Sequence, residues 1–310
     1  MSDTEDQGIP LEGGVASDVR VIDTPDGPLV VKKALAKLKV AADWFSDPSR
    51  SMIEVAAIQA FGSVGGTETV PEIVWVRPDE NCFAMRLVAP RLRNWKTDLL
   101  DGRIDLATAA RVGEILGLFH SRSAQRPELA RRFDDLQFFH ELRVEPFFDH
   151  VAGQKPHLAP RIREITAAML GRRQALVHGD YSPKNILADG GDAVILDFEV
   201  THWGDPRFDV AFCLAHLMLK SALVGGHPAK LGAAIQTFLD GYRAKGLPIV
   251  DAGLAHVTAC LLLARLFGKS PADYLARLDS GAIEAKANEL LAMKAAPQSS
   301  DFLIFPELHA

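Results

Sequence analysis

The segment 175–198 constrains the fold more than any other part of this 310-residue chain. It begins with an apolar stretch, Ala175–Val177, continues as a polar loop, and ends in two short apolar stretches, Ile186–Ala188 and Val194–Leu196. The turn sequence Asp-Gly-Gly-Asp between these two stretches, at 189–192, is typical of a β-hairpin. The sequence therefore predicts a strand, a polar loop and a hairpin in succession.

The register of this hairpin indicates where polar groups gather. Symmetry about Gly191 places Asn185 opposite Asp197, and facing residues of an antiparallel pair have Cα atoms roughly 4.5–5.5 Å apart. An amide oxygen and a carboxylate at the open end suit Mg²⁺, which takes one or two protein groups together with phosphate oxygens. Asp180, on the loop that enters the same end, could accept the proton of an attacking hydroxyl. A turn of satisfied polar residues is the alternative, but it does not explain why three such groups converge.

The motif His178–Asn185 (His-Gly-Asp-Tyr-Ser-Pro-Lys-Asn), followed by Asp197–Glu199 (Asp-Phe-Glu), resembles the signature of the aminoglycoside phosphotransferase and choline kinase superfamily. Protein kinases use the same arrangement in two related motifs. The resemblance implies a protein-kinase-like fold in which Asp180 is the catalytic base. It also implies that Asn185 and Asp197 are the Mg²⁺ ligands.

Other residues of this region are expected to position the catalytic loop or to contact the transferred phosphate. The resemblance makes His178 a structural support of the loop and lets Lys184 reach the transferred phosphate. The segment Gly204–Ala211 is similar to the G-D-P-x-x-D-x-A stretch of the superfamily, in which the second aspartate, here Asp209, braces the catalytic loop. Asp205 has a plainer role, because an aspartate followed by proline commonly begins a helix.

The first part of the chain is rich in predicted strands. Thr24–Gly27 is a turn sequence between two of them. Asp47 and Pro48 are typical of an N-cap and a first helical position, which predicts a helix that continues to about Phe61. The predicted strands are Val19–Ile22, Leu29–Lys32, Glu72–Val76 and Cys82–Leu87.

The remainder of the chain has a helical pattern, with apolar residues at 3.6-residue spacing. We therefore expect an α+β fold with two lobes: a small β-rich nucleotide-binding lobe at residues 1–89 and a larger helical lobe, catalytic and acceptor-binding, at 90–310. A hinge near 85–90 would join them. The predicted helices are Leu106–His120, Phe133–Val151, Ala159–Gly171, Arg207–Leu223, Ala229–Lys245, Ala252–Phe267 and Ile283–Ala295.

Leu11–Asp18 resembles the short glycine loop that covers the triphosphate in this superfamily. Glycines such as Gly13 and Gly14 let backbone N–H groups approach phosphate oxygens, and Ser17 lies on the same segment. Lys32, on the strand that follows, matches the lysine that contacts the α- and β-phosphates. We therefore expect these residues to bind the nucleotide.

Lys33 neighbours this lysine but would point to the other face of the strand. The kinase template pairs the strand lysine with a glutamate of the following helix, and Glu54 is the candidate. An ordinary surface pair of Glu54 with Arg50, one turn earlier, is the alternative. Met85–Val88 would form the hinge and offer backbone groups to the adenine.

The bulk properties exclude several classes of protein. A formal net charge of −6 gives no basic surface for nucleic acid. No apolar run reaches the length of a membrane span, because His216 and Lys220 interrupt the best stretch in the C-terminal half. The first residues do not form a secretory signal, so we expect a cytoplasmic protein. Cys82, Cys213 and Cys260 are far apart and indicate buried thiols rather than a disulfide or zinc site.

The expected activity is an ATP- and Mg²⁺-dependent transfer of a γ-phosphoryl group to a hydroxyl of a small molecule. The motifs of P-loop kinases, serine hydrolases of the G-x-S-x-G type and H-E-x-x-H zinc enzymes do not occur in the sequence. A catalytically inactive nucleotide-binding module of the same fold is the alternative from another class. The presence of Asp180, Asn185 and Asp197 argues against it. The sequence carries no signal for an oligomeric state.

The acceptor stays open between several classes. Aminoglycosides are polycations and need an acidic pocket, whereas choline or ethanolamine needs an aromatic cage, for which Trp203 is well placed. Val30–Leu35, Trp44 and Asp47–Arg50 together look similar to the N-terminal lobe of methylthioribose kinases, although those enzymes differ in the loop after His-Gly-Asp. We therefore expect a sugar or polyol hydroxyl as the acceptor.

The segment Ala259–Phe267 is apolar on nearly every helical face and is interrupted only by Arg265. A buried guanidinium is rarely left uncompensated, because an isolated buried charge is costly. One interpretation is a structural ion pair, or a side chain that reaches solvent at the helix end. The other is that Arg265, with Lys269 one turn later, lines the acceptor cleft and binds an oxygen-rich or anionic substrate group.

Overall fold

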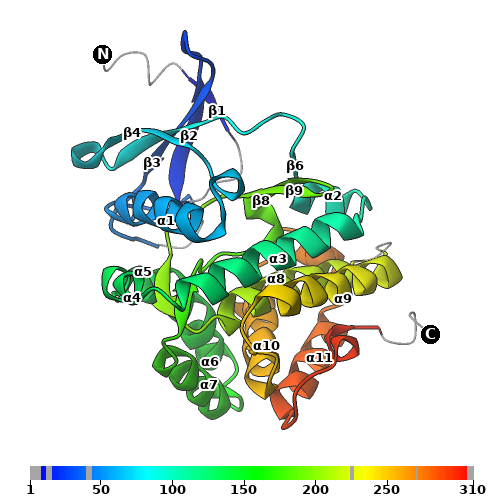
Figure 1. Cartoon of the computed structure of the whole chain (residues 1–310). Coiled ribbons are helices and arrows are strands. Elements are labelled where there is room, and N and C mark those ends of the chain that lie inside the picture. Colours follow the sequence, from blue (N-terminus) through cyan, green and yellow to red (C-terminus); the bar gives the residue numbers. More distant parts are fainter. Residues whose placement is uncertain (1–7, 12–15, 40–43, 224–226, 270, 306–310) are drawn as a thin grey trace.

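The computed structural model of the chain describes residues 8–11, 16–39, 44–223, 227–269 and 271–305. Figure 1 shows an antiparallel sheet with helix α1 in the upper part of the molecule and a larger set of helices below it. The predicted α+β fold with a small β-rich lobe and a larger helical lobe is confirmed. The boundary near residue 89 stays a prediction.

The upper sheet has the strand order β1-β2-β3-β5-β4. The predicted hairpin and its turn are present, because β2 pairs with β3 and the Thr24 hydroxyl donates to the backbone oxygen of Gly27 (2.6 Å). Lys32 points inward and is buried, whereas Lys33 is exposed, as the alternation of a strand requires. The strands are β1 (Ile9–Pro10), β2 (Ser17–Ile22), β3 (Leu29–Ala34), β4 (Ile73–Arg77) and β5 (Cys82–Arg86).

Helix α1 spans Arg50–Gly65, so its predicted start at Asp47 and Pro48 is wrong. The Asp47 carboxylate accepts a hydrogen bond from the backbone N–H of Ser49 (2.8 Å), which forms a separate turn before the helix. Asx turns of this kind use the same residue types as N-caps, and sequence alone does not separate the two.

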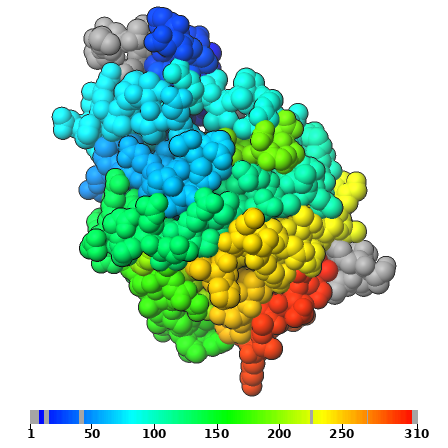
Figure 2. All heavy atoms as spheres, in the orientation of Figure 1, coloured from blue at the N-terminus to red at the C-terminus, as the bar shows by residue number. Residues whose placement is uncertain are grey.

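The lower lobe is mainly helical, and α7 and α10 have the predicted bounds. Helix α8 is buried at every position from Phe208 to Ser221 and forms the centre of this lobe. Figure 2 shows the face of Figure 1 as a packed surface, on which the yellow, orange and red segments adjoin one another. The helices are α2 (Trp95–Leu100), α3 (Leu106–Ser123), α4 (Pro127–Arg132), α5 (Gln137–Phe139), α6 (His150–Gln154), α7 (Ala159–Gly171), α8 (Arg207–Ser221), α9 (Pro228–Lys245), α10 (Ala252–Phe267) and α11 (Ser280–Ala292).

The predicted helix 133–151 is present as one helical run, but it begins later, at Gln137, and its hydrogen-bond pattern changes along its length. It consists of α5, a π-helical segment at His140–Asp149, and α6, which follow one another without a break. Pro146 lies inside the π-helical segment. It has no N–H to donate, so the helical hydrogen-bond pattern changes there.

Two small sheets support the segment 175–198. Strand β7 (Ala175–Val177) pairs with β10 (His202–Gly204), and β8 lies between β6 and β9. The predicted hairpin exists, but its register differs by one residue, so Asn185 faces Leu196 instead of Asp197. The reason is a two-residue turn in which Gly190 has a φ of +59°. The remaining strands are β6 (Arg93–Asn94), β8 (Ile186–Asp189) and β9 (Asp192–Ile195).

Cys82, Cys213 and Cys260 are all buried, which agrees with the predicted burial of these side chains. Among the described residues, no helix combines the length and the apolar character that a membrane crossing requires.

Candidate active site

The loop after β7 has a backbone shape that only a few residues can adopt. Gly179 has a φ of +80°, and a Cβ atom at this position would lie 2.7 Å from the backbone oxygen of Val200. The imidazole of His178 accepts a hydrogen bond from the backbone N–H of Asp180 (3.1 Å) and donates one to the Leu196 oxygen (3.1 Å). Burial lowers the pKa of His178, which keeps the ring neutral and able to do both. His178 therefore ties the loop to the end of β9.

Asp209, on the first turn of α8, holds the same loop from below. Its carboxylate accepts hydrogen bonds from the backbone N–H groups of His178 (2.7 Å) and Gly179 (2.8 Å). It also lies 3.1 Å from Nε2 of His120, whose Nδ1 lies 3.0 Å from the Tyr242 hydroxyl. The contact of Asp209 with the loop is the one that the resemblance implied. His120 and Tyr242 extend the brace to α3 and α9, and the sequence did not indicate them.

The carboxylate of Asp180 is buried and lies between two cations. Arg143 lies 3.1 Å from it and also donates to the backbone oxygen of Gly179 (2.7 Å). Lys184 lies 2.8 Å from the same carboxylate oxygen, and 41% of its side chain is exposed. Arg143 is on the π-helical segment, and our sequence reasoning missed it. An arginine between the apolar residues Leu142 and Val144 was the available signal.

Lys32 joins the two lobes through carboxylates. Its ammonium lies 2.7 Å from Glu54 on α1 and 2.5 Å from Asp197, which follows β9. Burial works against the charge of Lys32, but Asp197 and Glu54 outweigh burial and raise its pKa. Burial likewise opposes ionisation of Asp197, and the Lys32 ammonium overcomes it and lowers the pKa of that carboxyl. The predicted Lys32–Glu54 pair is therefore present, and Lys32 and Asp197 form a charged pair.

Arg50 is not the surface partner of Glu54 that the alternative interpretation required. It is fully buried and binds Glu199 (3.0 Å), a residue of the lower lobe. Its remaining N–H groups donate to backbone oxygens, among them those of Ser46 (3.0 Å) and Leu35 (2.9 Å). Sequence reasoning missed this pair because its members are 149 positions apart.

Carboxylates gather where the two lobes meet. Ligand atoms of Glu54, Asp197 and Glu199 all lie within 4.8 Å of one another. Asn185 donates its amide N–H to the backbone oxygen of Asp180 (3.0 Å), which leaves its side-chain oxygen as a ligand atom. Hard oxygen donors of this kind fit Mg²⁺ better than a soft metal. The roles of Asn185 and Asp197 as metal ligands stay predictions, and Glu199 joins them as a candidate.

The structure describes only some of the remaining residues that were predicted to bind the nucleotide. Gly13 and Gly14 lie outside the described residues. Ser17 begins β2 and is buried, and its hydroxyl has no hydrogen-bond partner among the described residues. Met85 lies on β5 and Val88 shortly after it, both partly buried. Their contacts with a nucleotide stay predictions.

The predicted acceptor-binding residues lie in different surroundings. Trp203 is on β10 opposite Leu176, only 8% exposed, so its role as part of an aromatic cage receives no support here and stays a prediction. Lys269 pairs with Glu145 of the π-helical segment (2.6 Å). Arg265 is partly buried on α10 and close enough to Asp180 for the two charges to influence each other.

Known proteins resemble this chain in sequence and in fold. A methylthioribose kinase of Bacillus velezensis is 27% identical over an alignment of 222 residues, and the match covers 62% of this chain and 55% of that protein. This chain therefore spans about half the length of the curated relatives it matches.

Two solved structures share the fold. An amicoumacin kinase in complex with AMP-PNP, Ca²⁺ and Ami has a TM-score of 0.58 at 14% identity, over 92% of this chain and 88% of that one. A thermostable mutant of an aminoglycoside phosphotransferase, in complex with AMP-PNP and hygromycin B, has a TM-score of 0.55 at 14% identity, over 94% and 93%. The sequence model of the Phosphotransferase enzyme family matches residues 7–247, and the chain belongs to this family.

Proposed function

We propose that the protein is an ATP- and Mg²⁺-dependent small-molecule kinase that phosphorylates a hydroxyl of a sugar or polyol. The observation that carries the proposal is the braced loop, which holds the buried carboxylate of Asp180 2.8 Å from Lys184, a cation whose charge also acts on Asp197. Membership of the Phosphotransferase enzyme family supports the reaction type. Relatives named as methylthioribose kinases support an acceptor of the sugar type.

In the proposed reaction the acceptor oxygen forms a bond to the γ-phosphorus, and the bond from this phosphorus to the β–γ bridging oxygen breaks, so that ADP leaves. Asp180 takes the proton of the acceptor hydroxyl. Lys184 can turn from Asp180 toward the transferred group, because its side chain is partly exposed.

The nucleotide would be held at the junction of the lobes. Lys32, fixed by Glu54, would bind the α- and β-phosphates. Asn185 and Asp197, with Glu199, would hold Mg²⁺, which neutralises negative charge on the phosphates when it is bound.

The test is ADP release with Mg·ATP in the presence of sugars, polyols, amino alcohols and aminoglycosides. We expect turnover with at least one sugar or polyol. Tight ATP binding without turnover on any member of the panel would favour the inactive nucleotide-binding module instead. Turnover confined to amino alcohols or aminoglycosides would retain the kinase but refute the acceptor class.

A further inference from the structure

Cationic side chains gather around Asp180 in the helical lobe. The carboxylates that accompany them include Asp180 itself, Asp273, which pairs with Lys96 (2.5 Å), and Asp197, on which the charge of Lys184 acts. His216 on α8 lies close to the group: burial lowers its pKa well below the usual value, and neighbouring cations lower it further. The cation cluster comprises Lys96 on α2, Arg143 on the π-helical segment, Lys184 on the catalytic loop, Lys220 on α8 and Arg265 on α10.

Lys220 is the least compensated member of this cluster. Its side chain is 1% exposed, and its ammonium lies 3.3 Å from the His216 backbone oxygen, 3.4 Å from the Tyr274 hydroxyl and 5.4 Å from the centroid of the Tyr274 ring. No carboxylate of the described residues lies within ion-pair distance of it. Burial and the charge of Lys96 lower its pKa to about 7. Fully buried lysines are rare unless they are paired.

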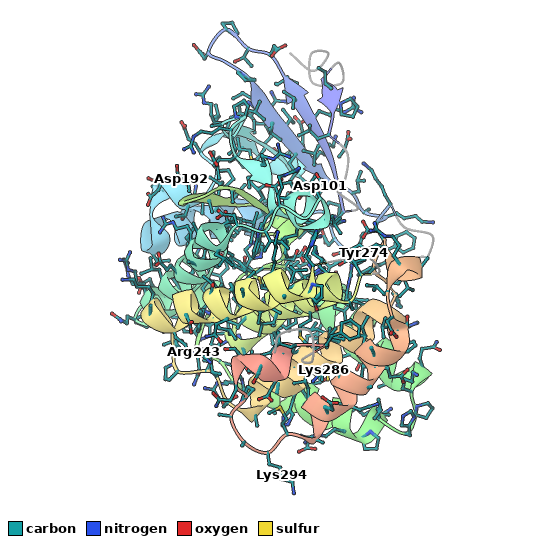
Figure 3. All side chains as sticks on the ribbon, turned by 90° about the vertical axis from the view of Figure 1, so that its right-hand side faces the viewer. Asp101, Asp192, Arg243, Tyr274, Lys286 and Lys294 are labelled. Carbon is teal, nitrogen blue, oxygen red and sulfur yellow. The ribbon has the colours of Figure 1, made fainter. Side chains whose placement is uncertain are left out.

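The cluster extends from solvent to the interior. The side chains of Lys96 and Lys184 are 29% and 41% exposed, whereas Arg143 and Lys220 are buried. Figure 3 shows Tyr274, which contacts Lys220, between the sheet above and the yellow helix α9 below it. The cluster therefore joins exposed lysines and buried cations in one charged region that includes Asp180.

We propose that the cation cluster binds an anionic group of the acceptor, a carboxylate or a phosphate ester, while the hydroxyl of the same molecule lies at Asp180. The proposal rests on the proposed kinase function and narrows its acceptor. Lys220 supplies a point charge for this group, and Arg265 supplies a planar fork that can donate two parallel hydrogen bonds. A polycationic acceptor would meet a surplus of cationic side chains over carboxylates instead, which disfavours it.

The first test compares acceptors that differ only in charge: gluconate against glucitol, and ribose 5-phosphate against ribose. We expect kcat/KM for ADP release to favour the anionic member of at least one pair by about 10- to 100-fold, the value of hydrogen bonds to charged groups. Which pair responds distinguishes a carboxylate from a phosphate ester. Turnover of the neutral members with equal or greater efficiency would overturn the proposal and leave the kinase function standing.

Two variants test whether the cation cluster causes the preference for anionic acceptors. Lys220→Met removes the buried charge and keeps the length of the side chain, and Arg265→Lys keeps the charge but removes the fork. Each should reduce the preference for the anionic member, Arg265→Lys through a raised KM with an unchanged melting temperature. Lys294→Met is the matched control, because this lysine is exposed at the far end of the molecule and should leave the preference unchanged (Figure 3). A preference that survives in Lys220→Met would also refute the assignment.

A binding measurement separates this proposal from the kinase function. With Mg·ADP at saturation, so that the nucleotide site is filled, ribose 5-phosphate or gluconate should raise the melting temperature of the wild type and of Lys294→Met, but not that of Lys220→Met. That result without turnover would retain the anion site and refute the kinase. No stabilisation by either anion would refute the anion site, whatever the turnover.

Discussion

Asp180 is the residue on which the proposed chemistry depends most directly. Asp180→Asn keeps the shape of the side chain but removes the proton acceptor, so turnover should fall by about 100-fold or more while ATP affinity stays nearly constant. Asp192→Asn, on the exposed hairpin turn labelled in Figure 3, is the control and should change neither quantity. A loss of less than about tenfold, or ~1.4 kcal/mol of barrier, would mean that Asp180 is not the base.

Lys220 links a stability measurement to the cation cluster. The pKa of Lys220 is lowered in the folded state, so between about pH 7 and 10.5 the unfolded chain binds this proton and the folded chain does not. The free energy of unfolding therefore rises with pH over that window. Below pH 7 the folded protein carries the full destabilisation that results from burying the Lys220 charge. Lys220→Met should therefore raise the free energy of unfolding by a few kcal/mol at pH 6, with a gain that narrows toward pH 9.5, since one pKa unit corresponds to about 1.4 kcal/mol.

The neighbours of Lys220 do not obscure this test. Burial lowers the pKa of His216 well below the pH window in which Lys220 titrates. Burial raises the pKa of Cys213 and the pKa of Tyr274 above that window. Asp273 stays ionised, because Lys96 lowers its pKa against the effect of burial. The other cations that act on Lys220 are Lys96 and Arg265. Urea unfolding of both proteins at several pH values gives the answer, and a less stable Lys220→Met protein at every pH would assign Lys220 a structural role.

Sequence reasoning reached those residues of the site that lie close together in the chain or follow a known template. The loop 178–185 and the Lys32–Glu54 pair are of this kind. Arg50 and Arg143 were missed, because their partners Glu199 and Asp180 come from distant elements. Whether a given arginine is exposed or buried depends on the packing of helices, which local pattern does not determine.

At the scale of elements, regular helices were predictable and irregular ones were not. The bounds of α7 and α10 agree with the periodicity of their apolar residues. The π-helical segment was not expected, because Pro146 alters a hydrogen-bond pattern that periodicity does not report. The register of β8 and β9 was wrong by one residue, because turn length cannot be read from two adjacent glycines.

The hairpin β8–β9 carries a prediction of its own. Asp197→Ala removes an anionic ligand at its open end, so a higher Mg²⁺ concentration should be needed for nucleotide binding at fixed ATP. Asp189→Ala, at the exposed turn of the same hairpin, should leave the Mg²⁺ titration unchanged. If Asp197→Ala also leaves it unchanged, the metal ligand is another carboxylate of the cluster, with Glu199 the first to test.

At the scale of the whole molecule, two ion pairs of the described residues join the lobes: the partly buried Lys32–Asp197 and the fully buried Arg50–Glu199. Arg50→Met leaves Glu199 buried without its partner, so the free energy of unfolding should fall by about 3–5 kcal/mol. The double variant Arg50→Met, Glu199→Gln should recover part of this loss, because it removes the isolated charge. Urea unfolding measures both, and a loss below about 1 kcal/mol would show that the pair does not hold the lobes together.

The hydrogen bonds from Tyr242 through His120 to Asp209 also have a consequence for folding during synthesis, because their members are made at different times. Tyr242 is made about 60 residues after the loop that it helps to brace, which corresponds to roughly 3 to 12 seconds of synthesis. For most of that interval, once residue 199 has been added, the growing chain contains β3, α1 and the carboxylates that surround Lys32. Under the proposed function, we expect a nascent chain to acquire the capacity to hold a nucleotide before the capacity to turn it over.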